Sequence, residues 1–212
     1  MSGDFYWVSK TLNNKVLIAV GDCTGHGVPG ALMSIMGTAF INEVVSENPN
    51  VSPSKLLEEL RDRVIDGLQQ KGEEGEARDG MDISICLIDT KTLKFSFAGA
   101  FNPMYMVRDK DLTVIDADAQ PIGYYLEETK PFTEKHFNLK KGDVMYLTTD
   151  GYQDQFGGPK GKKFMKKQLK EMLIDISHMP LNEQETHIDN RMKDWMSEEF
   201  QVDDICVLGF KV

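Results

Sequence analysis

The sequence predicts an α+β fold in which mainly antiparallel sheets are layered with helices. The hydrophobic patterns run as strand hairpins, two helices, further hairpins, two more helices and a last strand. This order differs from the strict strand–helix alternation of a doubly wound parallel sheet. Apolar residues make up 41% and charged residues 27%, which suits a packed core. Since no linker or repeat divides the 212 residues, we expect a single domain over residues 1–212.

The first two strands are expected to form a hairpin. Residues 4–9 and 15–21 are rich in aromatic and β-branched side chains and flank an Asn-Asn pair that tolerates turn geometry. With a three-residue turn at Leu12–Asn14, Asp4 lies directly opposite Asp22; with a two-residue turn the two point to opposite faces. Like charges placed opposite each other destabilise a sheet, so the first register makes sense mainly with a cation between them. The sequence leaves both registers open.

The remaining elements follow from periodicity and from turn residues. Helices are expected over residues 29–45 and 52–70, the second opening at a Ser-Pro pair that serves as N-cap and first helical position. The polar, Gly-rich loop 72–80 is the best candidate for a mobile segment. Later strands are expected at 83–88, 94–98, 104–108, 113–115, 136–139, 144–148 and 205–212, and later helices at 162–177 and 183–197.

Charge and cysteine content narrow the possible partners and compartment. With 24 basic and 34 acidic residues the net charge is −10, so nucleic acid is not an expected partner. The longest clean apolar run, residues 16–20, is too short to span a bilayer, and the start of the chain lacks the basic region of a signal peptide. Three cysteines without zinc-type spacing suit a reduced, cytoplasmic protein without membrane contact through this domain.

One segment opposes the overall acidity, because six lysines fall within eleven residues. They are Lys160, Lys162, Lys163, Lys166, Lys167 and Lys170. These lysines form either a solvated helix face or a docking surface for an anionic partner.

Aspartates stand at the ends of several predicted strands. Asp22 ends the apolar run VLIAVGD, and Asp150 ends VMYLTTDG. Asp203 and Asp204 begin the last strand, and Asp4 begins the first. Strand ends present side chains to clefts, so these aspartates could converge; the alternative is that they are turn and cap residues. Carboxylates without His or Cys partners favour hard cations such as Mg²⁺ or Mn²⁺, which activate water for attack on phosphorus.

The densest glycine segment is GDCTGHGVPG, residues 21–30. Glycine permits close backbone approach, and the segment opens a helix whose N-terminus favours anions. A tight strand-to-helix turn is the alternative explanation. His26 is a candidate general acid or phosphate contact, whereas Cys23 is a poor nucleophile candidate because no basic partner is evident. No Walker A sequence or nucleophile elbow is present, so nucleotide binding is a weak alternative.

Four segments together resemble a known family. GDFYW, GDCTGHGVPGALMS, TTDGYQDQFGG with GKKF, and VDDICVLGF occur in the order found in the SpoIIE-type (RsbU-like) branch of the PPM (type 2C) metal-dependent serine/threonine phosphatases. The resemblance covers nearly the whole chain and implies a four-layer αββα sandwich. It also implies hydrolysis of phosphoserine or phosphothreonine by direct attack of water activated by two divalent ions, Mn²⁺ or Mg²⁺.

The resemblance also implies roles for individual residues. Asp22 matches the aspartate that bridges the two ions, and the backbone carbonyl of Cys23 matches a further ligand. Asp150 and Asp203 match metal ligands, and Asp4 matches an acidic position near the second ion that acts through water.

Two departures from the family pattern stand out. His26 comes four residues after Asp22, whereas the family's D-G-H spacing puts histidine two residues after, so a general-acid role does not transfer. Near Gly99–Phe101 no carboxylate occupies the position that helps hold a third metal in the family.

One further residue matches the family pattern. Asp204 matches the second position of an acidic pair and is expected to support the site.

The resemblance further implies partners. The expected substrate is a phosphorylated STAS-type anti-sigma-factor antagonist, and the chain resembles an output domain excised from a longer protein with an upstream sensor domain. Helices 29–45 and 52–70 would transmit the signal. The competing interpretation is a catalytically weak or inactive signalling module of the same fold, motivated by the missing third-metal carboxylate and the family's missing N-terminal strand.

Overall fold

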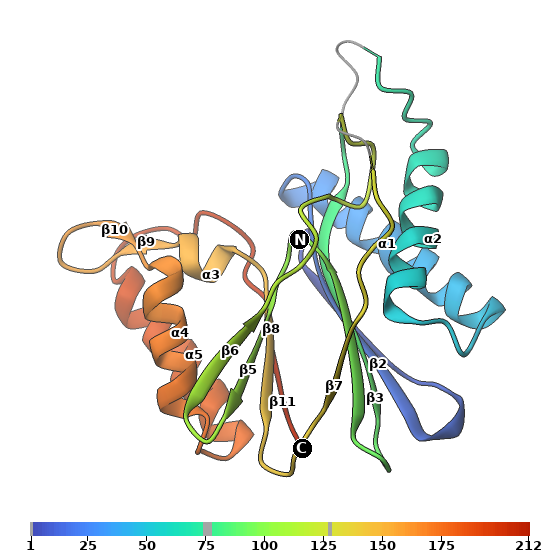
Figure 1. Cartoon of the computed structure of the whole chain (residues 1–212). Helices are drawn as coiled ribbons and strands as arrows, with labels where there is room; N and C mark the ends of the chain where they lie inside the picture. Colours follow the sequence, from blue (N-terminus) through green and yellow to red (C-terminus); the bar gives the residue numbers. More distant parts are fainter. Residues whose placement is uncertain (1, 74–77, 127–128) are drawn as a thin grey trace. The chain divides into compact units, whose positions relative to one another are not determined.

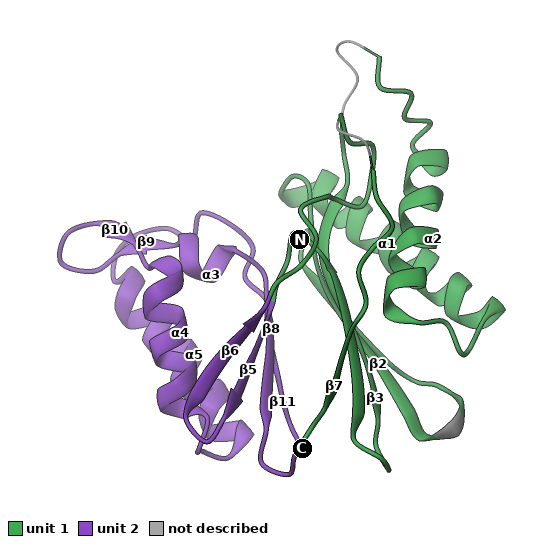
Figure 2. Ribbon diagram, in the orientation of Figure 1, with its two compact units in different colours: residues 1–103, 116–139 green, residues 104–115, 140–212 purple. Residues whose placement is uncertain are grey.

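The computed structural model describes residues 2–73, 78–126 and 129–212 (Figure 1). The chain divides into two compact units: unit 1 comprises residues 1–103 and 116–139, and unit 2 comprises residues 104–115 and 140–212 (Figure 2). Each unit has its own sheet and its own pair of long helices, and we describe them separately. The single domain expected over residues 1–212 stays a prediction.

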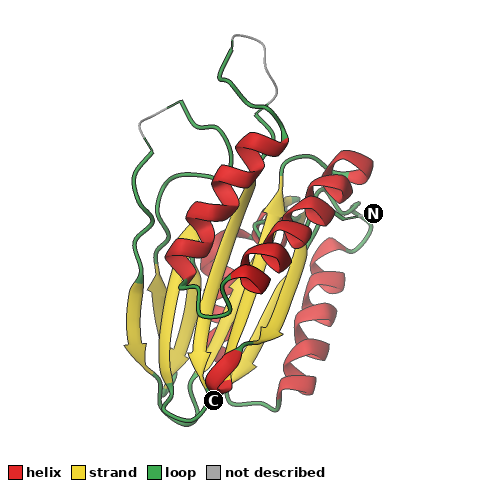
Figure 3. Ribbon diagram, turned by 90° about the vertical axis from the view of Figure 1, so that its right-hand side faces the viewer, coloured by secondary structure: helices red, strands yellow, loops and turns green. Residues whose placement is uncertain are grey.

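Unit 1 is built on a five-stranded antiparallel sheet in the order β1-β2-β3-β4-β7. Its elements are β1 (Phe5–Lys10), the 3₁₀ turn η1 (Leu12–Asn14), β2 (Lys15–Cys23), α1 (Gly27–Glu47), α2 (Pro53–Gly67), β3 (Met81–Asp89), β4 (Lys94–Ala100) and β7 (Lys135–Asn138). The two helices run along this sheet (Figure 3). The predicted N-cap is confirmed, since the Ser52 hydroxyl accepts a hydrogen bond from the backbone N–H of Lys55 at 3.4 Å.

The core of unit 1 lies between the sheet and the two helices. Leu17, Ala19 and Cys23 of β2 are buried in it together with residues of both helices. Because side chains alternate along a strand, Asp22 points to the other face of the sheet. The strand pattern therefore supplies core packing from one face and keeps a carboxylate on the other.

Helix α1 is apolar on nearly all sides. Met33, Ile41 and Val44 pack into the core of unit 1, whereas Leu32 and Ile35 are more than 60% exposed. By length and composition α1 could cross a membrane. Core helices of globular proteins share this length and composition.

Unit 2 carries a four-stranded antiparallel sheet in the order β11-β8-β5-β6 and a small two-stranded hairpin. Its elements are β5 (Met104–Arg108), β6 (Asp111–Ile115), β8 (Val144–Thr148), α3 (Gly151–Asp154), β9 (Phe156–Gly157), β10 (Lys162–Lys163), α4 (Met165–Ile176), α5 (Leu181–Met196) and β11 (Val207–Lys211). Its core joins Tyr105 and Tyr146 of the sheet to Phe164, Leu169 and Leu173 at and within α4.

The predicted fold class, α+β with mainly antiparallel sheets and flanking helices, is confirmed. The open question of hairpin register is resolved in favour of the three-residue turn, because η1 occupies Leu12–Asn14 and Phe5 pairs with Gly21. The Gly-rich loop 72–80 lies partly outside the described residues, so its expected mobility stays a prediction.

Several predicted boundaries differ from the structure by two or three residues; the helix expected over 52–70, for example, ends at Gly67. Two further differences have a tertiary cause. The helix expected from residue 162 begins at Met165, because Lys162–Lys163 pair with Phe156–Gly157 as a short hairpin. The last strand begins at Val207, so Asp203 and the residue after it lie in the preceding loop. The repeated lysines suggested a helix face, and the acidic pair suggested the start of a strand. The pairing of β9 with β10 and of β8 with β11 instead determines where α4 and β11 begin.

A buried ion pair fixes the sheet of unit 2. The Asp143 side chain is 1% exposed and accepts hydrogen bonds from Arg108 Nε at 2.8 Å and Nη2 at 2.6 Å, and from the backbone N–H of Lys140 at 2.7 Å. Burial alone would raise the pKa of Asp143, but these donors outweigh it and hold the pKa below its ordinary value.

We expect Asp143→Asn to lower the free energy of unfolding by about 1–3 kcal/mol at pH 7, because buried donors lose their charged acceptor. A depressed folded-state pKa contributes stability above the ordinary carboxyl pKa and loses it as the pH falls through the folded value. The difference between wild type and variant should therefore shrink below about pH 4. Urea unfolding followed by circular dichroism at pH 7 and pH 3.5 measures it.

The control is Asp189→Asn, which removes an exposed ion pair with Lys193 on α5. Such pairs contribute less than about 1 kcal/mol. An equal loss in both variants, or a difference that grows in acid, would contradict the assignment.

Candidate functional site

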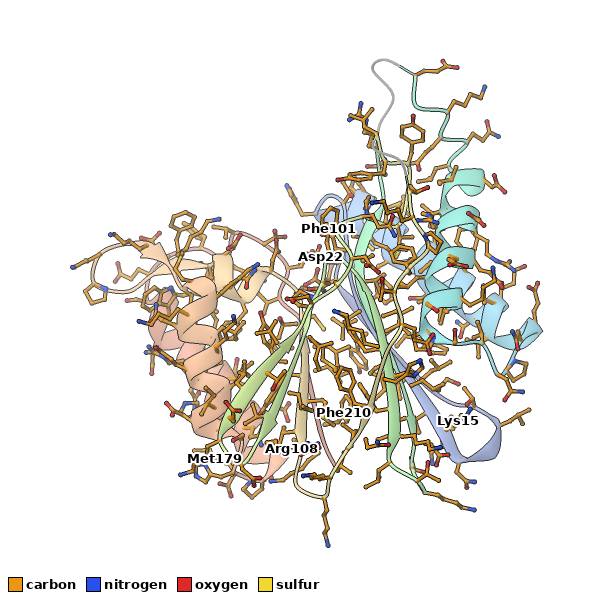
Figure 4. The ribbon with its side chains drawn as sticks, viewed as in Figure 1. Lys15, Asp22, Phe101, Arg108, Met179 and Phe210 are labelled. Atoms are coloured by element: carbon orange, nitrogen blue, oxygen red, sulfur yellow. The ribbon has the colours of Figure 1, made fainter. Side chains whose placement is uncertain are left out.

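Three carboxylates follow one another across adjacent strands at one end of the unit 1 sheet. The β2–β3 register places Asp22 directly opposite Asp82. Continuing the β1–β2 register by one residue beyond Phe5 and Gly21 places Asp4 opposite Asp22 on its other side. All three are half-buried. Asp22 thus lies between two like charges, and Figure 4 shows it at the opposite end of β2 from Lys15.

Asp82 was not among the predicted site residues. Its sequence signal was weak, since a lone aspartate beside the start of a strand also suits a turn. The pairing that makes it important joins β2 to β3 across two intervening helices, and a single sequence does not show that register.

The thiol of Cys23 reports the local electrostatics. Burial, and then the negative charges of Asp22 and Asp4, raise the pKa of Cys23 to about 12. Cys23 is 5% exposed and packs in the core of unit 1, which agrees with the expectation that its thiol is not a nucleophile.

Close backbone packing fixes the Gly-rich loop beside the start of the chain. A side chain at Gly30 would place its Cβ 2.2 Å from the carbonyl oxygen of Gly25 and 3.0 Å from the Cα of Gly3. Only glycine fits there, and Gly3 immediately precedes Asp4. His26 is exposed in this loop and begins α1 without a side-chain capping bond.

The same loop is tied to the start of β3. The backbone N–H of Thr24 donates to the carbonyl of Gly80 at 2.9 Å, and the N–H of Gly80 donates to the Thr24 hydroxyl at 3.1 Å. Because Gly80 lies two residues before Asp82, these bonds hold the third carboxylate in place relative to the loop.

Phe101 follows the end of β4 in unit 1. The β3–β4 register ends at the pair Ile83–Ala100, and Phe101 is the next residue after this end of β4. Phe101, labelled in Figure 4, is 42% exposed. Its ring packs edge-on against Tyr125 with centroids 6.2 Å apart, and its backbone has a φ of +54°. A bulky residue with positive φ is uncommon and is often found at functional sites. An aromatic ring therefore occupies the segment in which the third-metal carboxylate was noted as missing.

Unit 2 brings the second set of predicted residues together. A Cβ on Gly151 would lie 1.9 Å from the carbonyl oxygen of Asp204, so glycine is required immediately after Asp150. The backbone N–H of Thr149 donates to the carbonyl of Cys206 at 3.0 Å, which extends the β8–β11 pairing to this point. Asp150 and the acidic pair before β11 therefore come from two segments in direct backbone contact.

The buried amide of Gln155 holds the loop that carries the acidic pair. Its Nε2 donates to the carbonyl of Phe200 at 2.8 Å, and its Oε1 accepts from the N–H of Val202 at 3.1 Å. Asp203 follows directly, is exposed, and accepts a hydrogen bond from the N–H of Asp204 at 2.8 Å. Sequence reasoning did not single out Gln155, because a lone glutamine carries no spacing signal.

The predicted residues thus fall into two groups. Asp4, Asp22 and Cys23 belong to unit 1, and Asp150 and the pair Asp203–Asp204 belong to unit 2. Across the described ranges, no three histidine, cysteine, aspartate or glutamate side chains are gathered into a metal-binding group. Each unit orders its own group, and their convergence on shared ions stays a prediction.

Comparison with known proteins places the chain in a family. The family model "Stage II sporulation protein E (SpoIIE)" matches residues 13–212. Phosphoserine phosphatase RsbP of Bacillus subtilis is 26% identical over 156 residues, which cover 73% of this chain and 37% of RsbP. The chain therefore spans little more than a third of that curated relative.

Solved structures agree with this result. The SiaA-PP2C domain of Pseudomonas aeruginosa is 29% identical, with a TM-score of 0.89 over 100% of this chain and 81% of that one. The structure of the RsbU and RsbW domains of Rv1364c from Mycobacterium tuberculosis matches with 20% identity and a TM-score of 0.76, over 100% of this chain and 55% of that one. The matches confirm the PPM (type 2C) fold, and the chain belongs to the SpoIIE family of PP2C-type serine/threonine phosphatase domains.

Proposed function

We propose that the chain is a metal-dependent phosphoprotein phosphatase that hydrolyses phosphoserine or phosphothreonine. The observation that carries the proposal is the placement of Asp22 between two other carboxylates, in a chain of the SpoIIE family. Like charges placed directly opposite each other destabilise a sheet, and a bound cation would offset their repulsion.

The donor set fits hard divalent cations. Asp22 and its neighbours offer carboxylate oxygens, which Mg²⁺ and Mn²⁺ prefer, whereas burial beside these carboxylates raises the pKa of the Cys23 thiol. A solved relative by fold, RsbX, was determined in complex with magnesium. We propose two ions, and either metal satisfies this chemistry.

Each residue has a proposed task. Asp22, Asp150 and Asp203 are the principal carboxylate ligands, with the Cys23 carbonyl as an additional ligand and Asp4 acting through water. Bound ions would neutralise phosphoryl charge and lower the pKa of the water that attacks phosphorus, without a covalent enzyme intermediate.

Other residues support these ligands. Gly151 allows the chain after Asp150 to pack against the carbonyl of Asp204, and Gln155 holds the loop before Asp203. His26 is exposed at the start of α1 and is a proposed phosphate contact rather than a general acid. Gly151 and Gln155 thus help to orient the carboxylates. The proposed mechanism needs no proton transfer by a protein side chain.

The proposed setting is a cytoplasmic signalling protein of bacteria. One relative is named a phosphoserine phosphatase, and another structure joins an RsbU domain to an RsbW domain. We propose a phosphorylated STAS-type protein as substrate, an upstream sensor domain in the full-length protein, and no partnership with nucleic acid or membrane.

A second candidate function is a catalytically weak or inactive module of the same fold. The exposed ring of Phe101, in the segment without a third-metal carboxylate, is the observation that favours it. Titration of the folded chain with Mn²⁺ separates the two: no turnover at millimolar metal with intact circular dichroism supports the inactive module.

We expect Asp22→Asn and Asp150→Asn each to reduce Mn²⁺-dependent hydrolysis of a phosphoserine peptide by about 100-fold or more, through loss of charge stabilisation at the transferring group. The fold should persist by circular dichroism, because both side chains lie outside the two cores. Asp175→Asn, an exposed change on α4, is the control and should leave turnover intact. Unchanged turnover in either site variant contradicts the proposal.

We expect Asp82→Asn to raise the melting temperature of the metal-free protein, because it removes one of two charges facing each other across β2 and β3. Relief of about 0.2–1 kcal/mol corresponds to roughly 1–4 °C for a chain of this size. The added stabilisation by Mn²⁺ should be smaller in the variant than in wild type. Differential scanning calorimetry with and without metal measures both effects.

Asp89→Asn is the matched control at the other end of the same strand pair. Asp89 faces Lys15 in the register, so its neutralisation removes an attraction and should not raise the melting temperature. A rise in both variants would show a general effect of net charge instead of repulsion at the site.

A further inference from the structure

Five exposed lysines gather where α3 leads into α4, in an otherwise acidic chain. The lysine surface consists of Lys160, Lys162, Lys163, Lys166 and Lys167. Residues 155–170 contain these five and Lys170 but no acidic side chain, which leaves 18 basic and 34 acidic residues for the rest of the chain. The sequence left open whether this run is a solvated helix face or a docking surface.

The structure excludes a single helix face as the explanation. Lys162 and Lys163 form β10, paired with Gly157 and Phe156 of β9, and α4 begins only at Met165. The lysines therefore come from a hairpin and from the first turn of the following helix. Two different elements carry the same charge. The pattern of an amphipathic helix accounts for the lysines of α4 but not for those of β10.

These charges contribute little to the stability of the local fold, although Lys163 also lies over the Phe156 ring at 5.9 Å. Lys166 and Lys167 occupy the first turn of α4, where the helix dipole disfavours positive charge. Lys163 pairs with Asp154 at 3.0 Å, and Lys167 approaches Glu171 at only 3.9 Å with both side chains more than half exposed. Surface pairs of this kind contribute little. The cost of clustering the lysines therefore needs another explanation, which binding supplies.

The hairpin is held firmly and presents the lysines in a fixed place. The N–H of Gly158 donates to the carbonyl of Trp195 at 2.7 Å, and the N–H of Phe164 donates to the carbonyl of Gln155 at 2.9 Å. Phe164 is fully buried, with its ring edge-on to those of Tyr152 and Trp195 at 5.2 Å each.

The lysine surface is also close to the site in the chain. Helix α3 connects Asp150 to the hairpin in a single turn, and α3 packs against α4. Gln155 anchors both the hairpin and the loop before Asp203. A protein that presents a phosphorylated residue to Asp150 and Asp203 would therefore extend over neighbouring parts of unit 2.

We propose that the lysine surface docks an acidic patch on the phosphoprotein substrate, beside its phosphorylated residue. The proposal rests on the phosphatase function and adds a specificity determinant to it. A local acidic patch matches a local cluster of lysines, whereas an extended nucleic acid or anionic membrane would also meet the acidic remainder of the chain. Electrostatic docking acts mainly on the association rate and weakens with salt.

The test uses two phosphoserine peptides that differ only in flanking residues, glutamate in one and glutamine in the other. Wild type should hydrolyse the glutamate peptide with the higher kcat/KM at low salt. Changing Lys160, Lys162 and Lys166 together to Glu should abolish this preference. The kcat/KM for the glutamate peptide should fall about tenfold at low salt, and this fall should be smaller in 0.5 M NaCl. Hydrolysis of p-nitrophenyl phosphate should stay unchanged, since that substrate has no flanking charge.

The matched control changes three exposed lysines elsewhere, Lys91, Lys110 and Lys141, to Glu and should retain the preference. An equal preference in wild type and the Lys160/Lys162/Lys166 variant overturns the docking proposal while leaving the phosphatase function standing. If wild type hydrolyses nothing, the phosphatase function fails, and fluorescence anisotropy with both peptides decides docking: equal affinities refute it. Tighter binding of single-stranded DNA or anionic vesicles also refutes it.

Discussion

Repulsion between carboxylates across adjacent strands is the constraint around which unit 1 is organised. Asp22 faces Asp82 in the β2–β3 ladder, and Asp4 continues the row on the other side. The arrangement persists because the opposite faces of the same strands bury Leu17, Ala19 and their partners against two helices. Apolar packing on one face therefore holds like charges together on the other, where a bound cation would offset their repulsion.

Close backbone contacts hold the segments around Asp4, Asp22 and Asp150 in place. Gly30 allows the Gly-rich loop to lie against Gly3, and Gly151 allows the chain after Asp150 to lie against Asp204. Any side chain at these two glycines would collide with backbone atoms. The short motifs around the aspartates thus have a structural reason as well as a chemical one, since they bring separate segments into contact without side chains between them.

The distribution of charge separates two functions within one acidic chain. A few carboxylates stand at strand ends, where they suit divalent cations, and a cluster of lysines lies on the hairpin and helix that follow Asp150. The phosphoryl group and the protein that carries it pose different recognition problems. In the proposed function, metal ligands would address the first, and the lysine surface would address the second.

Much of this followed from the sequence alone. Alternating and helical periodicities predicted the fold class and most elements, and long motifs predicted the family, because these signals lie in residues close together in the sequence. The same motifs single out Asp22, Asp150 and Asp203 as site residues, which stays a prediction. Pairing between distant segments was decided by tertiary structure. Only the β2–β3 register revealed Asp82, only the β9–β10 pairing shortened the predicted helix at residue 162, and only packing showed why Gly151 and Gln155 are needed. Such contacts depend on which distant segments pair in the folded chain, and the local sequence around a residue does not determine that pairing.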